Sequence, residues 1–387
     1  MEKKYLSKRY QNMKGTAMGA SDVAAKSFND VINLSLGDPD MITPEIIIDK
    51  AFEDAKAGHT KYTDFRGYPE LRDEIRKFYK EEYGLDVKDE EVFVCTSGCI
   101  AMYLVMEAIL NDGDEVILQG PYFTPYPGQV TLARGIPVEM PTYEEEDFQI
   151  NTERLESMIN EKTRAIVLNS PNNPTGSCLT LETMEKVAEI VKKHDLILVA
   201  DEIYTSFSYE NKFIPFRSIE GMAERTITIN SFSKNFVMTG WRIGNIIAPD
   251  YIVDAIKKIN EGVAFTAPSI SQRAALHALR HRNEVQPKIV NEFRERMFYA
   301  AERINQIPNM HVIYPPKGSF YLFPNIKATG LTSKEVADRI LQEAHVLVLP
   351  GDAFGSCGEG HLRICCTVGK EKLEEAFNRI SKMDIFR

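Results

Sequence analysis

A lysine followed at short range by an arginine is the pair of residues in this sequence that most clearly could take part in catalysis. Lys234 closes the segment Ser231-Phe232-Ser233-Lys234, and Arg242 follows eight positions later in Gly240-Trp241-Arg242. A partly neutral lysine amine attacks carbonyl groups and moves protons, and a nearby cation such as Arg242 is expected to lower its pKa. The arginine fork matches a phosphate group. Because a lone lysine is usually solvated surface, this pair needs support from other segments.

Three other segments carry groups suited to small-molecule chemistry. Thr96-Ser97-Gly98-Cys99 opens a predicted helix, whose free N–H groups and dipole suit a phosphate, although simple helix capping is the more common reason for such a segment. A turn rich in proline and asparagine spans Ser170 to Gly176, and its simplest interpretation is a plain loop. Asp201 directly follows an apolar run and is either a site residue or a helix cap. Each pattern alone is weak evidence for a site, so the prediction depends on whether these segments lie together in the fold.

All four segments follow short apolar runs that predict strands. The runs do not alternate apolar with polar residues, and they are separated by helical patterns, which predicts a mostly parallel, doubly wound sheet flanked by helices in an α/β fold. Ligands bind beyond the carboxyl ends of such strands, so the four segments are expected to meet there. The predicted strands are Glu91–Cys95, Glu115–Gln119, Arg164–Asn169, Leu196–Ala200 and Thr226–Asn230.

The chain is expected to form two domains. Residues 46–280 form the large domain, and residues 1–45 with 281–387 form a smaller α+β domain. The charge run Glu144–Asp147 is expected to be a solvated loop. The other predicted elements are helices at Thr43–Gly58, Tyr68–Tyr83 (ended by Gly84), Asn283–Ile307, from Ser333 and from about Gly369, and strands at His311–Tyr314, Ser319–Phe323, Val346–Leu349 and His361–Cys366.

Composition narrows the classes of partner. The net charge of −10 over 387 residues argues against nucleic acid or an anionic membrane as the partner. The segment Met1 to Met18 is polar and basic, and no apolar run approaches the ~20 residues that span a bilayer, so a cytoplasmic protein is expected. The six cysteines lack zinc-ligand spacing and are expected to be reduced and mostly buried, with no metal.

Taken in order, these motifs resemble the class I/II pyridoxal-phosphate (PLP) dependent aminotransferases, the aspartate-aminotransferase-like group of PLP fold type I. The resemblance covers nearly the whole chain, and the Asn-Pro-Thr-Gly turn with the Ser-x-x-Lys and arginine pair is specific in combination. The matching segments are Gly37-Asp38-Pro39-Asp40, Lys61-Tyr62, Asn173-Pro174-Thr175-Gly176, Asp201-x-x-Tyr204, Ser231-x-x-Lys234, Gly240-Trp241-Arg242-x-Gly244 and Arg363.

The resemblance implies pyridoxal 5'-phosphate as the cofactor and gives each residue a role. Lys234 would form a Schiff base with the cofactor and then move a proton. Asp201, held ionised, would keep the ring nitrogen protonated. Asn173 and Tyr204 would hydrogen-bond the ring oxygen, and Phe123 would stack on the ring where many relatives have tryptophan.

Anion contacts are implied in the same way. The phosphate would meet backbone N–H groups of Ser97, Gly98 and Cys99, the hydroxyls of Ser231 and Ser233, Arg242, and Tyr62 from the partner subunit. That last contact implies a homodimer with shared active sites. The substrate α-carboxylate would meet Arg363, Asn173 and the backbone near Gly37. The segment Leu362–Cys366 departs from the family's usual small or polar residues after its arginine.

The implied reaction is transfer of an amino group from an L-amino acid, with aspartate or an aromatic amino acid favoured, to a 2-oxo acid such as 2-oxoglutarate. A carbon–sulfur β-lyase on the same scaffold is the alternative, since its cofactor residues would be identical. A PLP-binding regulator would need an appended DNA-binding module, which the sequence does not indicate. Arg9, Arg66 and Arg273 are candidates, by charge alone, for reading a side-chain carboxylate.

Overall fold

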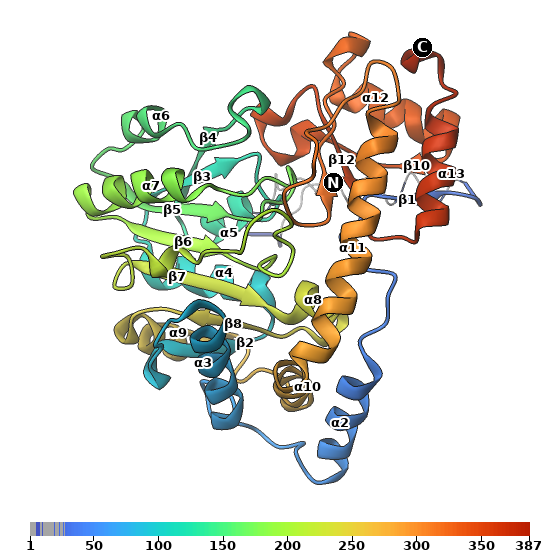
Figure 1. The fold of residues 1–387 in the computed structure, drawn as a ribbon. Coiled ribbons are helices and arrows are strands. Elements are labelled where there is room, and N and C mark those ends of the chain that lie inside the picture. The colour runs from blue at the N-terminus through green and yellow to red at the C-terminus, as the bar shows by residue number, and fades with distance from the viewer. Residues whose placement is uncertain (1–4, 8–9, 11–18, 20–22, 24–25, 27) are drawn as a thin grey trace.

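The computed structural model describes residues 5–7, 10, 19, 23, 26 and 28–387, and it consists of a large helix-covered sheet beside a smaller α/β part (Figure 1). The large sheet has seven strands in the order β2-β8-β7-β6-β5-β3-β4. β8 alone runs antiparallel to the other six strands, which confirms the predicted mostly parallel α/β sheet. The strands are β2 (Val92–Cys95), β3 (Glu115–Gly120), β4 (Ile136–Pro141), β5 (Thr163–Asn169), β6 (Ile197–Asp201), β7 (Thr226–Ser231) and β8 (Gly244–Ile247).

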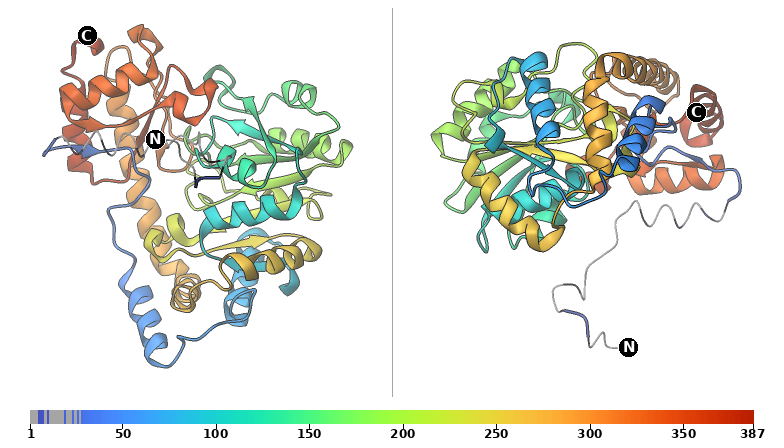
Figure 2. Two further views of the ribbon diagram at one scale, coloured as in Figure 1. Left: turned by 180° about the vertical axis from the view of Figure 1, so that it is seen from behind. Right: turned by 90° about the horizontal axis from the view of Figure 1, so that it is seen from below.

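Helices bury both faces of this sheet. Val116 and Leu118 of β3 pack with α4, α5 and α9, whereas Ile117 between them packs with the cluster that contains α7. This alternation follows from the pleat, which sends successive side chains to opposite faces. Figure 2 shows α4 from behind, lying across the strands. The helices of this part are α2 (Glu45–Lys56), α3 (Pro69–Tyr83), α4 (Ser97–Ile109), α5 (Tyr126–Leu132), α6 (Thr152–Ser157), α7 (Leu181–Lys193), α8 (Phe232–Asn235), α9 (Asp250–Val263) and α10 (Ser269–Arg280).

The smaller part is built mainly from the C-terminal third, with the long helix α11 leading into it (Figure 1). It holds a three-stranded antiparallel sheet, β11-β12-β9. β1 pairs in parallel with β10, so residues near the start of the chain pack with its end. The proposed domain boundaries at residues 45 and 280 remain a prediction. The elements are β1 (Ile32–Asn33), α11 (Arg282–Ile304), β9 (Tyr321–Leu322), α12 (Ser333–Arg339), β10 (Val346–Leu347), β11 (Leu349–Pro350), β12 (Leu362–Cys365) and α13 (Lys370–Ile380).

Two strands of the large sheet escaped prediction, and one predicted strand does not form. β4 contains Pro137 and lies at the sheet edge, where a missing N–H group is tolerated. β8 is only four residues long and follows directly on the Gly-Trp-Arg motif. The predicted strand His311–Tyr314 is reduced to one isolated bridge between His311 and Asn325.

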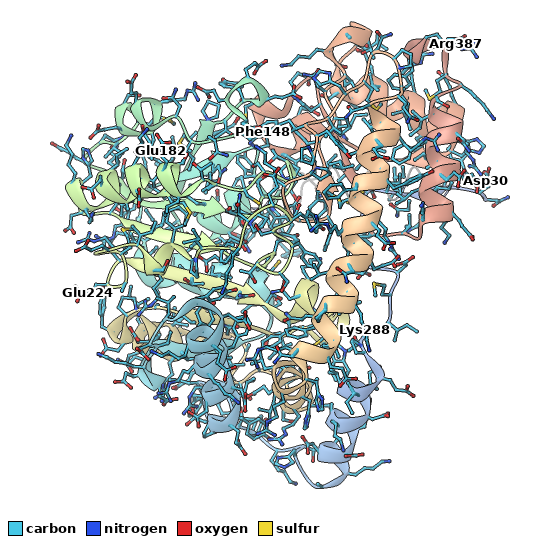
Figure 3. The ribbon with its side chains drawn as sticks, viewed as in Figure 1. Asp30, Phe148, Glu182, Glu224, Lys288 and Arg387 are labelled. Atoms are coloured by element: carbon cyan, nitrogen blue, oxygen red, sulfur yellow. The ribbon has the colours of Figure 1, made fainter. Side chains whose placement is uncertain are left out.

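The charge run Glu144–Asp147 is not a solvated loop as predicted, because three of its four carboxylates contact the smaller part, whereas Glu146 pairs with Arg154. Glu144 is half-buried and lies 3.2 Å from His311 and 3.5 Å from His361. Asp147 pairs with Lys317. The neighbouring Phe148, labelled in Figure 3, packs with Phe323, Leu349 and Phe354 of the smaller part. The acidic side chains thus join the two parts.

Candidate active site

A cavity of about 320 Å³ lies where the strands of the large sheet end and the smaller part begins. Every site residue predicted from the sequence lines it except Tyr62. Asp201 ends β6, Ser231 ends β7, and Asn173 lies in the turn after β5. The smaller part contributes Arg363 from β12 and Tyr321 from β9.

Lys234 lies in the short helix α8, directly after β7. Its Nζ donates a hydrogen bond to the backbone oxygen of Gly37. Burial is the main cause that lowers the pKa of Lys234 to about 8; the charge of Arg363 contributes in the same direction, and Asp38 opposes the shift. The prediction that Arg242 lowers this pKa is wrong: burial dominates, and the cation that contributes is Arg363. With a pKa of about 8, a tenth or so of this amine is neutral at pH 7.

Asp201 is a buried carboxylate with few partners. Its Oδ2 accepts a hydrogen bond from the hydroxyl of Tyr126, and its Oδ1 accepts one from the N–H of Ile203 at 3.3 Å. Burial raises the pKa of Asp201 to about 6, and these two donors limit the rise. Within the part of the chain that the structure describes, no cation pairs with this buried acid, which therefore suits a ligand that brings a positive charge.

The side chains expected around the cofactor ring meet in the cavity as predicted, but Tyr204 also has a partner of its own. Its hydroxyl lies 3.0 Å from that of Tyr321, and burial raises the pKa of Tyr204, so it stays a protonated donor. Phe123 lies at the wall, edge-on to Tyr126 with ring centroids 5.6 Å apart. Tyr321 also crowds Gly37, where an added Cβ would lie 1.9 Å from its hydroxyl.

An anion cradle forms at the start of α4. Ser97 has a φ of +76°, a strained backbone conformation for a non-glycine residue. The first N–H groups of a helix have no partner within the helix. Ser231 and Ser233 stand beside them, with their hydroxyl oxygens 2.9 Å apart. Arg242 is exposed and lines the same cavity, and its guanidinium donates to the backbone oxygen of Thr239 at 2.9 Å.

Arg363 is almost completely buried, at 1% exposure, without a carboxylate partner among the described residues. Its guanidinium donates to Asn173 Oδ1 at 3.1 Å and to the backbone oxygen of Ser35. It stacks against the rings of Tyr321 and Phe354. Its Nε has no nitrogen or oxygen hydrogen-bond partner among the residues that the structure describes. A buried cation with a spare donor fits a substrate carboxylate.

These residues fit PLP. One cavity is surrounded by an amine with a lowered pKa, an anion cradle, a buried acid, ring-oxygen donors and an aromatic wall. Arg363 lines the same cavity without a carboxylate partner among the described residues, which suits a second anion, the α-carboxylate of a substrate.

Comparison with known proteins identifies the family. The sequence model for aminotransferase class I and II matches residues 29–380. The chain belongs to this family. Class I and II aminotransferases depend on PLP, so this chain is a PLP-dependent aminotransferase of fold type I that acts on amino acids and 2-oxo acids.

Named relatives of this aminotransferase are similar over almost their whole lengths. An aspartate aminotransferase of Pyrococcus abyssi is 42% identical, covering 94% of this chain and 93% of the relative. Aromatic-amino-acid aminotransferase 2 of Thermococcus litoralis is 39% identical, covering 93% of each. The crystal structure of an aromatic aminotransferase from Pyrococcus horikoshii has a TM-score of 0.89 at 39% identity, covering 94% of this chain and 98% of that one.

Sequence reasoning missed Tyr126 and Tyr321, because neither belongs to a recognisable motif. Tyr126 is the first residue of α5, three positions after Phe123, and Tyr321 lies inside a predicted strand. Two of the three arginines proposed to read a side-chain carboxylate, Arg66 and Arg273, do not line the cavity. Arg66 pairs with Asp89 and Arg273 with Asp54, both outside the cavity. Arg9 lies outside the described residues.

The cysteines form no disulfide. Cys95, Cys365 and Cys366 are buried as expected, whereas Cys99 is exposed at the cavity. Among the residues that the structure describes, no cluster of potential metal ligands occurs. No helix in the described part of the chain is both long and apolar enough to cross a membrane.

The hydrogen bond from Tyr126 predicts a measurable pH effect. Tyr126→Phe removes a donor that favours ionised Asp201, so the pKa of Asp201 should rise from about 6 by roughly one unit. Since only the ionised carboxylate attracts a protonated ring nitrogen, PLP affinity should begin to fall at a higher pH in this variant. Titration of PLP binding between pH 5 and 8 checks this. Tyr122→Phe, which removes a weaker 3.4 Å contact to Glu139, is the control. An unchanged profile in Tyr126→Phe would contradict the assignment.

Proposed function

We propose that this aminotransferase moves the amino group of an L-amino acid, aspartate or an aromatic amino acid, to a 2-oxo acid such as 2-oxoglutarate. The observation that carries the proposal is a buried Arg363 with a spare donor in the same cavity as an amine of lowered pKa, Lys234. An α-amino acid carries the matching carboxylate and amine on one carbon.

Each residue has one proposed task. Bound PLP supplies an electron sink that stabilises negative charge at the substrate Cα. Lys234 would hold PLP covalently through its amine, and the same amine, when free, would take a proton from the substrate Cα and move it. Asp201 holds positive charge on the ring nitrogen, and Asn173 and Tyr204 donate to the ring oxygen. Arg363 and the backbone near Gly37 orient the α-carboxylate.

The phosphate is proposed to be held by the start of α4 and its neighbours. Backbone N–H groups of Ser97, Gly98 and Cys99 would donate to it, with Ser231, Ser233 and Arg242. Phe123 is proposed to cover one face of the ring. These contacts would hold the phosphate in place without using the amine of Lys234.

The donor preference is supported by the cavity wall and by the relatives. The cations that line the cavity within the described residues are Lys234, Arg242 and Arg363, and each already has a task. Leu36, Phe123 and Tyr321 provide apolar and aromatic surface. That surface suits an aromatic side chain, and the similar proteins are named aspartate and aromatic aminotransferases.

A panel of donors tests this function. Aspartate, phenylalanine, tyrosine and alanine are each offered with 2-oxoglutarate, oxaloacetate or pyruvate, and products are identified. We expect glutamate and the matching 2-oxo acid from aspartate or aromatic donors. The alternative carbon–sulfur β-lyase would instead release ammonia and pyruvate from a thioether amino acid without any acceptor. That outcome, with no amino transfer, would overturn the proposal.

A homodimer with shared active sites is also proposed. Tyr62 is 82% exposed and lies edge-on to Phe265, which is 41% exposed, with ring centroids 5.0 Å apart. Phe65 packs on the same Phe265 ring, giving an exposed aromatic patch of Tyr62, Phe65 and Phe265. Exposed aromatic patches are typical of interfaces. A partner that covered this patch would bring Tyr62 to the other subunit's phosphate.

Tyr62→Phe keeps the aromatic patch and removes the hydroxyl, so we expect PLP affinity to fall about tenfold or more, as for loss of one hydrogen bond to a charged group. Hybrid dimers of Tyr62→Phe and Lys234→Ala subunits supply the control. One site of each hybrid combines an intact Lys234 with an intact Tyr62 from its partner, and should bind with wild-type affinity. If PLP binding by the hybrid dimers equals the sum of binding by the two parent proteins, the active sites are not shared.

A further inference from the structure

Asn169 is a buried polar residue that does not line the cavity, yet it lies between two residues that do. It ends β5, is 3% exposed, and stands opposite Asp201 in the β5–β6 pair. Asn173 follows it by four positions in the turn after the strand. Its position is therefore behind the proposed cofactor contacts.

Both ends of the Asn169 amide are used. Its Nδ2 donates to the backbone oxygen of Asp201 at 2.9 Å, and its Oδ1 accepts from the backbone N–H of Asn173 at 2.7 Å. One partner is an acceptor and the other a donor, and a side-chain amide of this length offers both. An aspartate would set an oxygen against the Asp201 carbonyl, and an alanine would reach neither group.

The connection continues to the substrate side. Asn173 Oδ1 accepts from Arg363 at 3.1 Å, so one hydrogen-bonded path runs from Asp201 through Asn169 and Asn173 to Arg363. Asn172 behaves differently, because its Oδ1 accepts from the N–H and hydroxyl of Thr175 inside the same turn. Asn172 shapes the turn, whereas Asn169 ties the turn to the end of β6.

We propose that Asn169 is a positioning residue that holds Asn173 in register with Asp201 and Arg363 without touching cofactor or substrate. The proposal rests on the proposed function, because the residues it aligns are those assigned to the ring oxygen, the ring nitrogen and the α-carboxylate. A displaced turn would misplace the Asn173 donor, and small misplacements of such groups are costly in preorganised sites.

Asn169→Leu tests this, because leucine has a similar size and no charge but makes neither hydrogen bond. PLP affinity is measured by titration of the apoprotein, and the pH midpoint of the visible absorbance of the bound cofactor is measured separately. We expect affinity to fall about tenfold, as for one to two lost hydrogen bonds. The midpoint should rise by about half a unit or more, because a donor to the ring oxygen favours its negatively charged form.

A second substitution separates positioning from a structural role. In an Asn173→Ala background, Asn169→Leu should shift the midpoint no further, since its effect passes through Asn173. Asn151→Leu is the matched control: Asn151 also uses both ends of its amide, with Arg154 N–H at 3.0 Å and Glu146 at 2.9 Å, but far from the cavity. It should lower the melting temperature and leave the midpoint unchanged.

Three results would overturn the proposal. The first is a folded Asn169→Leu protein with wild-type affinity and midpoint, whatever its melting temperature. The second is full additivity with Asn173→Ala. If the leucine variant does not fold, Asn169→Ala is measured in its place and judged by the same two criteria. The third is a wild-type protein that takes up no PLP, which would remove the proposed function itself and is recognised before any variant is made.

Discussion

Replacement of Lys234 by alanine is expected to lower the rate of transamination by about 10⁴-fold, because a positioned acid–base group contributes up to that much and the covalent link is lost with it. The rate is measured as kcat with the best donor and 2-oxoglutarate. PLP should still bind, since the residues assigned to its phosphate, ring nitrogen and ring oxygen remain.

Lys258→Ala is the matched control for the lysine substitution. Lys258 is exposed on α9 and pairs with Asp254 at 2.6 Å, so its loss should leave kcat unchanged. A Lys234→Ala protein that retains kcat within tenfold of the wild type would remove Lys234 from the mechanism.

Asp201→Asn is expected to lower kcat by about 10²–10³-fold, which is typical for loss of one preorganised electrostatic contact. The amide has the same shape and still accepts from Tyr126, but it carries no negative charge to hold a proton on the ring nitrogen. Measurement of kcat and KM separates this effect from weaker substrate binding, and KM should change little. Asp195→Asn, at an exposed carboxylate paired with Arg225, is the control. Wild-type kcat in Asp201→Asn would contradict the assigned role.

The same substitution should stabilise the apoprotein. In the folded chain the pKa of Asp201 is raised to about 6 from 3.8, so burying its charged form costs free energy. This cost is absent below about pH 4, grows as the pH rises to 6 and is complete above it. Asp201→Asn removes the cost, and the free energy of unfolding at pH 7 should increase by about 1–3 kcal/mol. A site that trades stability for function in this way is common in enzymes.

Sequence reasoning could predict that Asp201, Ser231 and Asn173 line one cavity, because a parallel sheet brings the ends of its strands together. Asp201, Ser231 and the Asn173 turn are distant in the sequence, but each follows an apolar strand, so the fold alone predicts that they meet. The glycine after α3 was equally predictable, since Gly84 takes a left-handed conformation (φ +70°) that ends the helix.

The other features of the site depend on packing between distant elements, which no local sequence pattern predicts. Tyr126 reaches Asp201 only because α5 packs beside the end of β6, and Tyr321 enters the cavity from the other part of the molecule. From the sequence, Arg242 is the expected cause of the lowered pKa of Lys234, because the two residues are close in the chain. Burial and Arg363, which is 129 residues away in the chain, are the causes in the folded protein. Separation along the sequence is thus a poor guide to which charges interact in the folded protein.

The most direct test of the central claim is to reduce the PLP-loaded protein with borohydride, digest it and map the modified peptide by mass spectrometry. The account predicts that the cofactor is fixed on the peptide that contains Lys234, and that prior addition of an amino donor lowers this labelling. Cofactor fixed on a different lysine, or no covalent label on a protein that carries out amino transfer, would contradict it.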